Sequence, residues 1–337
     1  MDVLPPLGLI SDKSLPFVLD KKYRRILAQL GKNVRASHSQ IARAVGLSRD
    51  SVRYRTGILS KEGVLRGSRT VVDVSLLGYQ SYHLFLSIKN PDLHIRQGLI
   101  DKLVRLSFVR VVLALYGEYD FEIAVIAKTV DELDSHIAEI IEITKDYLRE
   151  LELLIVSRSL VARSFPLSFS SDEVSLRPSS KKILPDSVDL AILKVIRNDA
   201  SLSLLEIGKK VKLSHDVVSY RLKKMEKSFI KSYIPVVNYH KLGYATHVLL
   251  FSFHTLDREN EAKLERFFKS QESILWAVKT IGSYSVLAYV EIHTTEELQT
   301  LIESIRTEFA EQMTRYRSLI ASAEYAYTYA PDCIFGN

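Results

Sequence analysis

The sequence has a single cysteine, Cys333, and no apolar run long enough to cross a membrane. One cysteine excludes an intramolecular disulfide and a zinc site made of cysteines. A bilayer span needs about 18–20 consecutive apolar residues. The first 19 residues contain two Asp and three Pro, so they do not resemble a signal peptide. We therefore expect a cytoplasmic protein without a membrane partner.

Glycine and proline are also sparse, with 13 Gly and 9 Pro among 337 residues, and 47% of the residues are hydrophobic. This composition excludes long disorder and fibrous repeats, and the length predicts two or more domains. A glycine-rich phosphate loop and a nucleophile elbow are both missing. His240, His247 and His254 are seven residues apart, so on a strand neighbouring members would face opposite sides. We expect no enzymatic activity, no cofactor and no metal site.

The chain contains an internal repeat. Residues 39–55 and 205–221 are identical at eight of 17 positions, whereas unrelated segments would share roughly one. Between the copies, 166–185 contains six Ser and three Pro and is typical of a linker; the alternative is a surface loop within one domain. The predicted organisation is an N-terminal tail 1–19, a first pair of equivalent domains 20–66 and 186–232, a second pair 67–165 and 233–332, the linker 166–185 and a C-terminal tail 333–337.

Charge follows the same division. Residues 20–66 carry twelve Lys+Arg against three Asp+Glu, and residues 186–232 carry ten against six. The segments that follow are acidic: residues 67–165 carry eleven Lys+Arg and fourteen Asp+Glu, and residues 233–337 carry nine Lys+Arg and thirteen Asp+Glu. A compact basic module indicates a polyanionic partner. Together with a helix-turn-helix pattern in the same segments, this charge predicts double-stranded DNA as the partner.

The basic segments predict helix-turn-helix modules. In the first copy a helix from His38 to Val45 leads through the turn Gly46–Leu47 to a second helix that ends at Leu59. Ser48 is a natural N-cap for that second helix, which is the element that enters a DNA major groove. A β-branched strand follows to Val74 and forms either a small wing or an exit strand.

The predicted DNA contacts lie on these helices. Arginine pairs with guanine, and Ser or Tyr bonds phosphate or a base edge. The candidates in the first copy are Arg43, Ser48, Arg49, Asp50, Arg53, Tyr54 and Arg55, and those in the second are Lys209, Ser214, His215, Ser219, Tyr220 and Arg221. Arg55 and Arg221 have two interpretations: a phosphate clamp, or an internal salt bridge to Asp50 or Asp216.

The acidic segments favour the order strand, helix, strand, strand, helix, strand. The predicted strands are 82–89, 110–116, 121–127 and 151–162, then 246–254, 274–281, 286–292 and 316–329. The predicted helices are 96–106, 131–148, 258–270 and 295–312. This order is ferredoxin-like (βαββαβ), so the predicted fold class is α+β, with two winged helix-turn-helix domains and two ferredoxin-like effector domains in tandem.

The motifs Ile41-Ala42, Gly46-Leu47-Ser48 and Leu77-Gly78-Tyr79, with Arg55 and Gly63, resemble the Lrp/AsnC family of transcription regulators. Members of that family carry one helix-turn-helix and one effector domain, so this chain resembles two fused subunits. The resemblance implies a sequence-specific DNA-binding regulator that responds to an amino acid or a related metabolite. It also implies intramolecular pairing of the two effector domains and further association into a homo-oligomer.

The resemblance further implies effector contact at one turn of each effector domain. These residues are Gly117, Glu118, Tyr119 and Asp120 in the first copy, and Gly282 and Tyr284 in the second. Carboxylates in the first turn can hold an ammonium group, and backbone amides can hold a carboxylate. The alternative is a tight hairpin that requires only glycine. In the second copy, serines replace both acidic residues.

An enzyme is the other interpretation. Siroheme decarboxylases share this architecture as paired or fused subunits and carry an Asn-Tyr-x-Arg type motif. The corresponding stretches, 111–116 and 277–281, lack that motif. We therefore favour the regulator. Incubation with siroheme distinguishes the regulator from the enzyme, because the absorption spectrum of bound tetrapyrrole indicates the enzyme.

Overall fold

The protein is described from a computed structural model, which covers residues 16–89, 92–167, 169, 184–254 and 256–336. Most of the predicted N-terminal tail and of the linker 166–185 lie outside the described residues. The chain divides into two compact units. The helical unit comprises the described residues within 17–79, 174–238 and 328–337, and the barrel unit comprises those within 1–16, 80–173 and 239–327.

The first copy of the helical unit contains three helices: α1 (Lys21–Lys32), α2 (His38–Val45) and α3 (Arg49–Lys61). Side-chain caps start all three, because Asp20, Ser37 and Ser48 accept hydrogen bonds from the free amides of the first turns. Gly46 ends α2 with a φ of 69°. The apolar sides of the helices meet in one core, formed by Ile26, Leu30, Ile41, Ala42, Val45 and Val52.

The second copy repeats this arrangement with α6 (Ser187–Ile196), α7 (Leu204–Val211) and α8 (His215–Glu226). Asp186, Ser203 and Ser214 are the corresponding N-caps. The turn differs at one position: Lys212 occupies the place of Gly46, with a φ of 56°. This backbone conformation is uncommon for a residue with a side chain.

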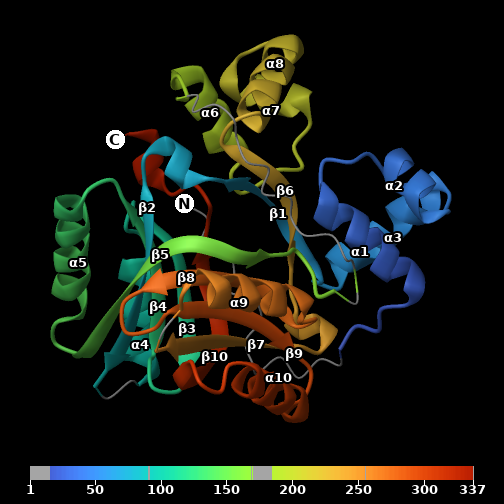
Figure 1. Cartoon of the computed structure of the whole chain (residues 1–337). Coiled ribbons are helices and arrows are strands. Elements are labelled where there is room, and N and C mark those ends of the chain that lie inside the picture. Colours follow the sequence, from blue (N-terminus) through green and yellow to red (C-terminus); the bar gives the residue numbers. More distant parts are fainter. Residues whose placement is uncertain (1–15, 90–91, 168, 170–183, 255, 337) are drawn as a thin grey trace. The chain divides into compact units, whose positions relative to one another are not determined.

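The strand after each helix trio pairs with its counterpart from the other copy. β1 (Leu65–Val72) and β6 (Ile230–Val237) lie side by side in Figure 1 and form a two-stranded antiparallel sheet with Thr70 opposite Tyr233. The sequence predicted either a small wing or an exit strand after the recognition helix, and the structure has the exit strand. The short helices η1 (Val74–Leu77) and η2 (His240–Leu242) follow these strands.

The barrel unit contains two βαββαβ modules, as predicted. The first is β2 (Gln80–Ile88), α4 (Leu93–Leu103), β3 (Val109–Tyr116), β4 (Phe121–Ala127), α5 (Val130–Thr144) and β5 (Leu148–Ala162). The second is β7 (Ala245–Phe253), α9 (Arg258–Ser270), β8 (Ile274–Ile281), β9 (Val286–Ile292), α10 (Thr295–Glu308) and β10 (Met313–Tyr327). The predicted helices that ended at 106, 148 and 312 were too long at their C-terminal ends.

Two long strands join the modules into a closed barrel with the order β10-β3-β4-β2-β5-β8-β9-β7. β5 pairs with β2 of its own copy and then with β8, where Val161 lies opposite Ala277. β10 pairs with β7 and then with β3, where Ala321 lies opposite Leu115. Each copy therefore closes the sheet of the other.

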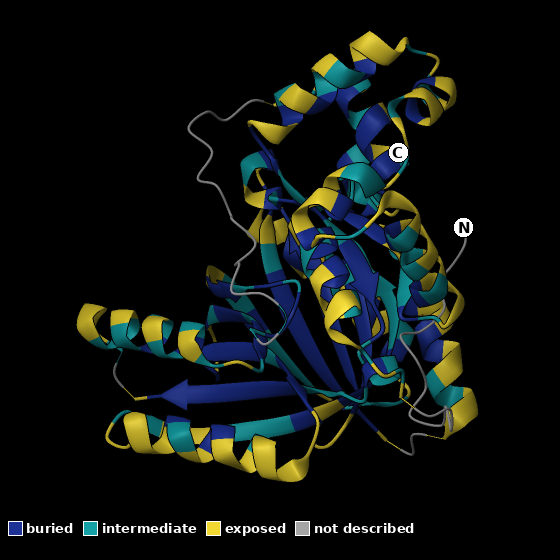
Figure 2. Cartoon of the chain, turned by 90° about the vertical axis from the view of Figure 1, so that its right-hand side faces the viewer, coloured by how far each residue is buried: buried dark blue, intermediate teal, exposed yellow. Residues whose placement is uncertain are grey.

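The barrel strands alternate between two apolar environments. One face packs against α9 and α10, through residues such as Phe251, Phe268 and Ile305. The other face points into the barrel, where residues of both copies meet, among them Phe85, Leu154 and Leu287. Figure 2 shows the strands mostly buried, while the helices keep an exposed side. No helix among the described residues is long and apolar enough to cross a membrane.

Candidate DNA-binding and ligand-binding sites

The first recognition helix, α3, presents a row of exposed side chains. Val52 and Leu59 are fully buried in the core, and this orientation leaves Arg49, Arg53 and Tyr54 in solvent. Tyr54 is 68% exposed. Within the described part of the chain, neither Arg49 nor Arg53 has an ion pair or hydrogen bond through its guanidinium. Both side chains are therefore available to an external partner.

The second recognition helix, α8, has the same orientation but a different surface. Val218 is buried, and His215, Asp216 and Tyr220 are exposed. Nδ1 of His215 lies 3.2 Å from Oδ1 of Asp216. Ser219, which replaces Arg53, is only half-buried and carries no charge. This helix consequently offers less positive charge to DNA than α3.

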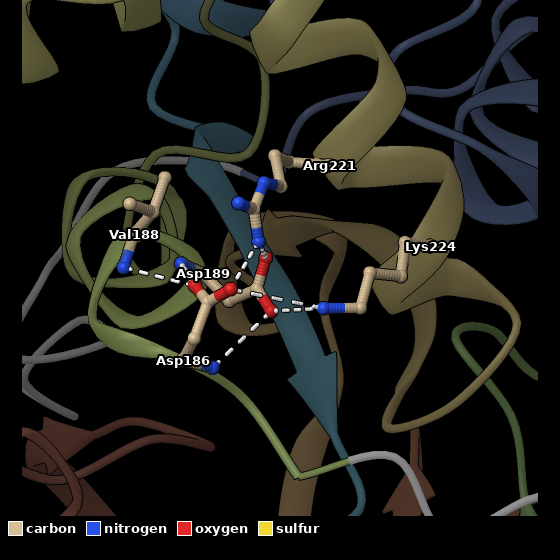
Figure 3. A network of polar contacts seen from close by, with 5 residues as sticks. All are labelled: Asp186, Val188, Asp189, Arg221 and Lys224. Carbon is tan, nitrogen blue, oxygen red and sulfur yellow. Dashed lines mark hydrogen bonds and ion pairs between the residues drawn. The ribbon is translucent and has the colours of Figure 1, made fainter.

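Arg221 of α8 is part of an internal ion-pair network (Figure 3). Its Nη1 donates to Asp186 and to Oδ1 of Asp189, the latter at 3.2 Å. Lys224 Nζ lies 2.9 Å from Oδ2 of Asp189, whose side chain is fully buried. Asp186 also accepts the amides of Val188 and Asp189, and these bonds together with Arg221 hold its carboxyl pKa below the usual range.

Arg55, the counterpart of Arg221, has different neighbours. Its Nη1 donates to Oγ of Ser51 at 2.5 Å, and its guanidinium carbon lies 5.7 Å from the centre of the Tyr23 ring. Within the residues that the structure describes, the buried Nε of Arg55 has no hydrogen-bond partner. The prediction that Asp50 pairs with Arg55 and Asp216 with Arg221 is wrong. Arg221 instead pairs with Asp186 and Asp189 at the start of α6, and Arg55 donates to Ser51, one turn earlier in α3. DNA contact by Arg55 and Arg221 stays a prediction.

The helices before the recognition helices add exposed cations. Arg43 of α2 and Lys209 and Lys210 of α7 all have exposed side chains. Ser48 and Ser214 cap their helices: the hydroxyl oxygen of Ser48 accepts the amide of Ser51 at 3.1 Å, and that of Ser214 accepts the amide of Val217 at 3.4 Å. Their hydroxyl protons are still free to donate to a phosphate.

The two glycine turns of the barrel unit lie against the other copy. Gly117 has a φ of +138°, and a Cβ there would lie 2.7 Å from Cδ2 of Leu319. Gly282 has a φ of +145°, and a Cβ there would lie 2.7 Å from the carbonyl oxygen of Leu153. Glycine is therefore needed for a close approach between the copies as well as for the hairpin.

The acidic side chains of the first turn already have partners within the protein. Asp120 accepts the amide of Ile88 at 2.8 Å and pairs with Arg96 at 3.3 Å. Glu118 pairs with Arg317 of β10. In the second turn, Ser285 takes the place of Asp120 and accepts the amide of Phe253 at 3.2 Å.

The aromatic residues of these turns point into the barrel. Tyr119 and Tyr284 are 3% and 2% exposed. Burial raises the pKa of Tyr119 strongly, so its hydroxyl stays protonated. Effector contact by these turns stays a prediction.

Sequence reasoning missed a polar cluster inside the barrel. Nδ1 of His83 lies 2.6 Å from Oε1 of Glu122, and the hydroxyl of Tyr289 donates to the same oxygen. Glu122 is fully buried on β4. The signal in the sequence is a single acidic residue in the otherwise apolar run 121–127. His83 and Tyr289 are 39 and 167 residues away, so only the fold brings them to it.

The comparisons with known proteins agree with the repeat. The AsnC-type helix-turn-helix domain matches this chain twice, at residues 19–59 and 186–226. The HTH-type transcriptional regulator LrpB of Bacillus subtilis is 30% identical over 121 residues, which are 36% of this chain and 80% of that protein. The regulatory protein AsnC of Haemophilus influenzae is 28% identical over 147 residues, 43% of this chain and 95% of that protein.

One solved structure is similar to both copies at once. The siroheme decarboxylase NirDL superimposes with a TM-score of 0.61 over 91% of this chain and 93% of its own, at 15% sequence identity. At this identity the likeness concerns the fold alone. The relationship in sequence, together with the two matched helix-turn-helix domains, decides the family: the chain belongs to the Lrp/AsnC family, with the unit of helix-turn-helix and effector domain present twice.

Proposed function

We propose that this protein is a DNA-binding transcription regulator in which one chain provides the two recognition helices that a family dimer takes from two subunits. The observation that carries the proposal is α3, where Arg49 and Arg53 extend from a serine-capped helix without partners in the described part of the chain. The names of the relatives, which are HTH-type transcriptional regulators, support the same function.

The proposed function makes the two recognition helices unequal. Arg53 is suited to bidentate contact with a guanine, whereas Ser219 at the equivalent position has one hydroxyl. The two half-sites of the operator then differ in sequence and in their share of the binding energy. Strand pairing between β1 and β6 supports a cooperative pair of modules, since each module completes the sheet of the other.

The test is a salt-titrated binding assay with genomic fragments that include the protein's own promoter. We expect selective binding with a steep salt dependence, because phosphate contacts release counterions. Arg53→Ala should weaken binding to the selected fragment by about 1–3 kcal/mol and leave binding to scrambled DNA nearly unchanged. Arg306→Ala, at an exposed arginine of α10 in the barrel unit, is the matched control. Equal affinity of the unmodified chain for selected and scrambled fragments contradicts the proposal.

We further propose that an amino acid or a related metabolite regulates DNA binding through the barrel unit. A ligand changes an equilibrium only if it binds the two states with different affinities. The ligand then changes the affinity of the protein for DNA, and DNA changes the affinity of the protein for the ligand by the same factor. Repeating the titration with individual amino acids tests this. An unchanged midpoint with every amino acid contradicts regulation by that class.

A tetrapyrrole enzyme is the second candidate, and the likeness of fold to NirDL is the observation that favours it. Incubation of the full chain with siroheme distinguishes the candidates. The regulator is expected to leave the absorption spectrum of free siroheme unchanged. A shifted spectrum of bound tetrapyrrole, followed by loss of carboxyl groups, supports the enzyme instead.

A further inference from the structure

The barrel interior is chemically asymmetric although the chain is a repeat. His83 and Glu122 of the first copy correspond to Val248 and Leu287 of the second. Conversely, the second copy has Tyr289 and Trp276 where the first has Ala124 and Val111. All four apolar counterparts belong to the buried cluster that fills the barrel. Among the described residues, the cluster around Glu122 therefore occurs in one copy only and is completed by residues of the other.

Glu122 is the centre of this cluster. Its Oε1 lies 2.6 Å from Nδ1 of His83 and accepts the hydroxyl of Tyr289, while its Oε2 is buried without a hydrogen-bond partner among the described residues. A buried acceptor without a donor costs about 1–3 kcal/mol, and such groups are rare in native proteins. The unused oxygen thus marks a place where a donor from outside the chain would be stabilised.

Aromatic rings flank the carboxylate. The rings of Trp276 and Tyr289 lie 4.8 Å apart at 30°, and the ring of His83 lies 5.5 Å from that of Trp276. Trp276 and Tyr289 are partly exposed, unlike the fully buried residues deeper in the barrel. Glu122 itself is fully buried, so a ligand reaches its carboxylate only if side chains of the barrel move; an eight-stranded barrel is wide enough to hold one small ligand.

The electrostatic environment favours a cation. Aromatic faces attract cations, and guanidinium combines a planar shape for stacking with paired N–H donors for a carboxylate. An ammonium group lacks the planar face that Trp276 and Tyr289 match.

We propose that the barrel binds one small metabolite with a guanidinium or amidinium group, whose N–H donors reach Oε2 of Glu122 and whose plane stacks on Trp276 or Tyr289. One such site per chain is expected, because the second copy has leucine in place of Glu122. Identifying this ligand as the regulatory effector rests on the proposed function, whereas the binding itself does not.

The chain offers a built-in probe, since Trp276 is its only tryptophan. The experiment titrates the full chain with agmatine and L-arginine and records tryptophan emission. L-citrulline is the uncharged control for L-arginine, and putrescine is the ammonium control for agmatine. We expect a saturable change with at least one guanidinium compound and a response at least tenfold weaker with its control.

Variants locate the site. Glu122→Gln should weaken binding at least tenfold, while Glu311→Gln, at an exposed glutamate, should leave it unchanged. Should Glu122→Gln fail to fold, the comparison of L-arginine with L-citrulline on the unmodified chain still decides. No saturable change with agmatine or L-arginine overturns the inference, and so does an equal response to L-citrulline or putrescine.

DNA binding by the ligand-free chain is measured in parallel. Selective DNA binding without any guanidinium response overturns this inference and leaves the DNA-binding proposal intact. A guanidinium response without selective DNA binding supports this inference and overturns the DNA-binding proposal. The two proposals therefore fail separately.

Discussion

Arg221 of the second recognition helix donates to the buried Asp189 at 3.2 Å, whereas its counterpart Arg55 lies over the ring of Tyr23. The two copies thus hold the same arginine by different interactions. In the second copy the arginine is bound to the carboxylates at the start of α6. In the first copy the guanidinium has no carboxylate partner among the described residues, so more of its charge is available to a phosphate.

Asp189→Asn should destabilise the second helix-turn-helix. Asparagine keeps an acceptor for the cap but removes the charge that faces Arg221 and Lys224. We expect a loss of about 1–3 kcal/mol, less than for a fully buried pair because solvent reaches both cations. Faster hydrogen exchange in α6 and α8 measures it. Asp216→Asn, whose side chain is 99% exposed, is the control, and an equal effect of the two changes contradicts the prediction.

Lys209→Ala should weaken binding to all DNA sequences alike. Lys209 is exposed on α7, before the recognition helix, where a phosphate contact is more suitable than a base contact. Loss of one phosphate contact lowers the slope of log affinity against log salt by about 1. The measurement is a salt titration with selected and scrambled fragments. A sequence-dependent loss, or an unchanged slope, contradicts a phosphate contact.

Much of the fold follows from the sequence. The repeat, the serine cap at Ser48 and the order βαββαβ were all readable from residue patterns. Which strands pair between the copies was not readable. β5 and β10 alternate in the same way whether their partner belongs to one copy or the other, so only the three-dimensional register reveals the closed barrel.

The sites were less predictable for a related reason. Local spacing suggested Asp216 as the partner of Arg221, but the actual partners lie 32 and 35 residues earlier, on another helix. The cluster around Glu122 joins two copies across 167 residues. A lone acidic residue in an apolar strand signals a buried polar partner without identifying it.

Gly282→Ala should destabilise the barrel unit more than Gly117→Ala. A Cβ at position 282 meets the backbone oxygen of Leu153, which cannot move alone, while at position 117 it meets the flexible end of Leu319. The positive φ at either site adds about 1–3 kcal/mol of strain. Urea unfolding measures both. Gly98→Ala, in helix α4 with open space around it, is the control and should stabilise by up to about 1 kcal/mol.

Equal losses at 117 and 282 would show that the backbone conformation, and not the approach between copies, dominates. No loss at 282 would contradict the close packing of the second turn against β5. Because the two glycines differ only in what their missing side chains would meet, the difference between the variants isolates the steric contribution.

Glu291 makes the stability of the barrel unit depend on pH. It is 4% exposed on β9, and burial raises the pKa of its carboxyl to about 8, although Thr246 donates hydrogen bonds of 2.9 and 3.0 Å to it. In the unfolded chain the pKa returns to about 4.3. Between these two values the folded state binds more protons, so the free energy of unfolding falls as pH rises from about 4.5 to 8 and then levels off.

Glu291→Gln should abolish this contribution. Glutamine keeps an acceptor for Thr246 and cannot ionise, so the variant should match the unmodified chain near pH 5 and melt at a higher temperature near pH 8. Thermal unfolding at several pH values measures the difference, with Glu311→Gln as the exposed control. Parallel curves for Glu291→Gln and the unmodified chain between pH 5 and 8 would mean that Glu291 is already ionised in the folded protein. A single buried carboxyl would then not govern the stability of the barrel in this range.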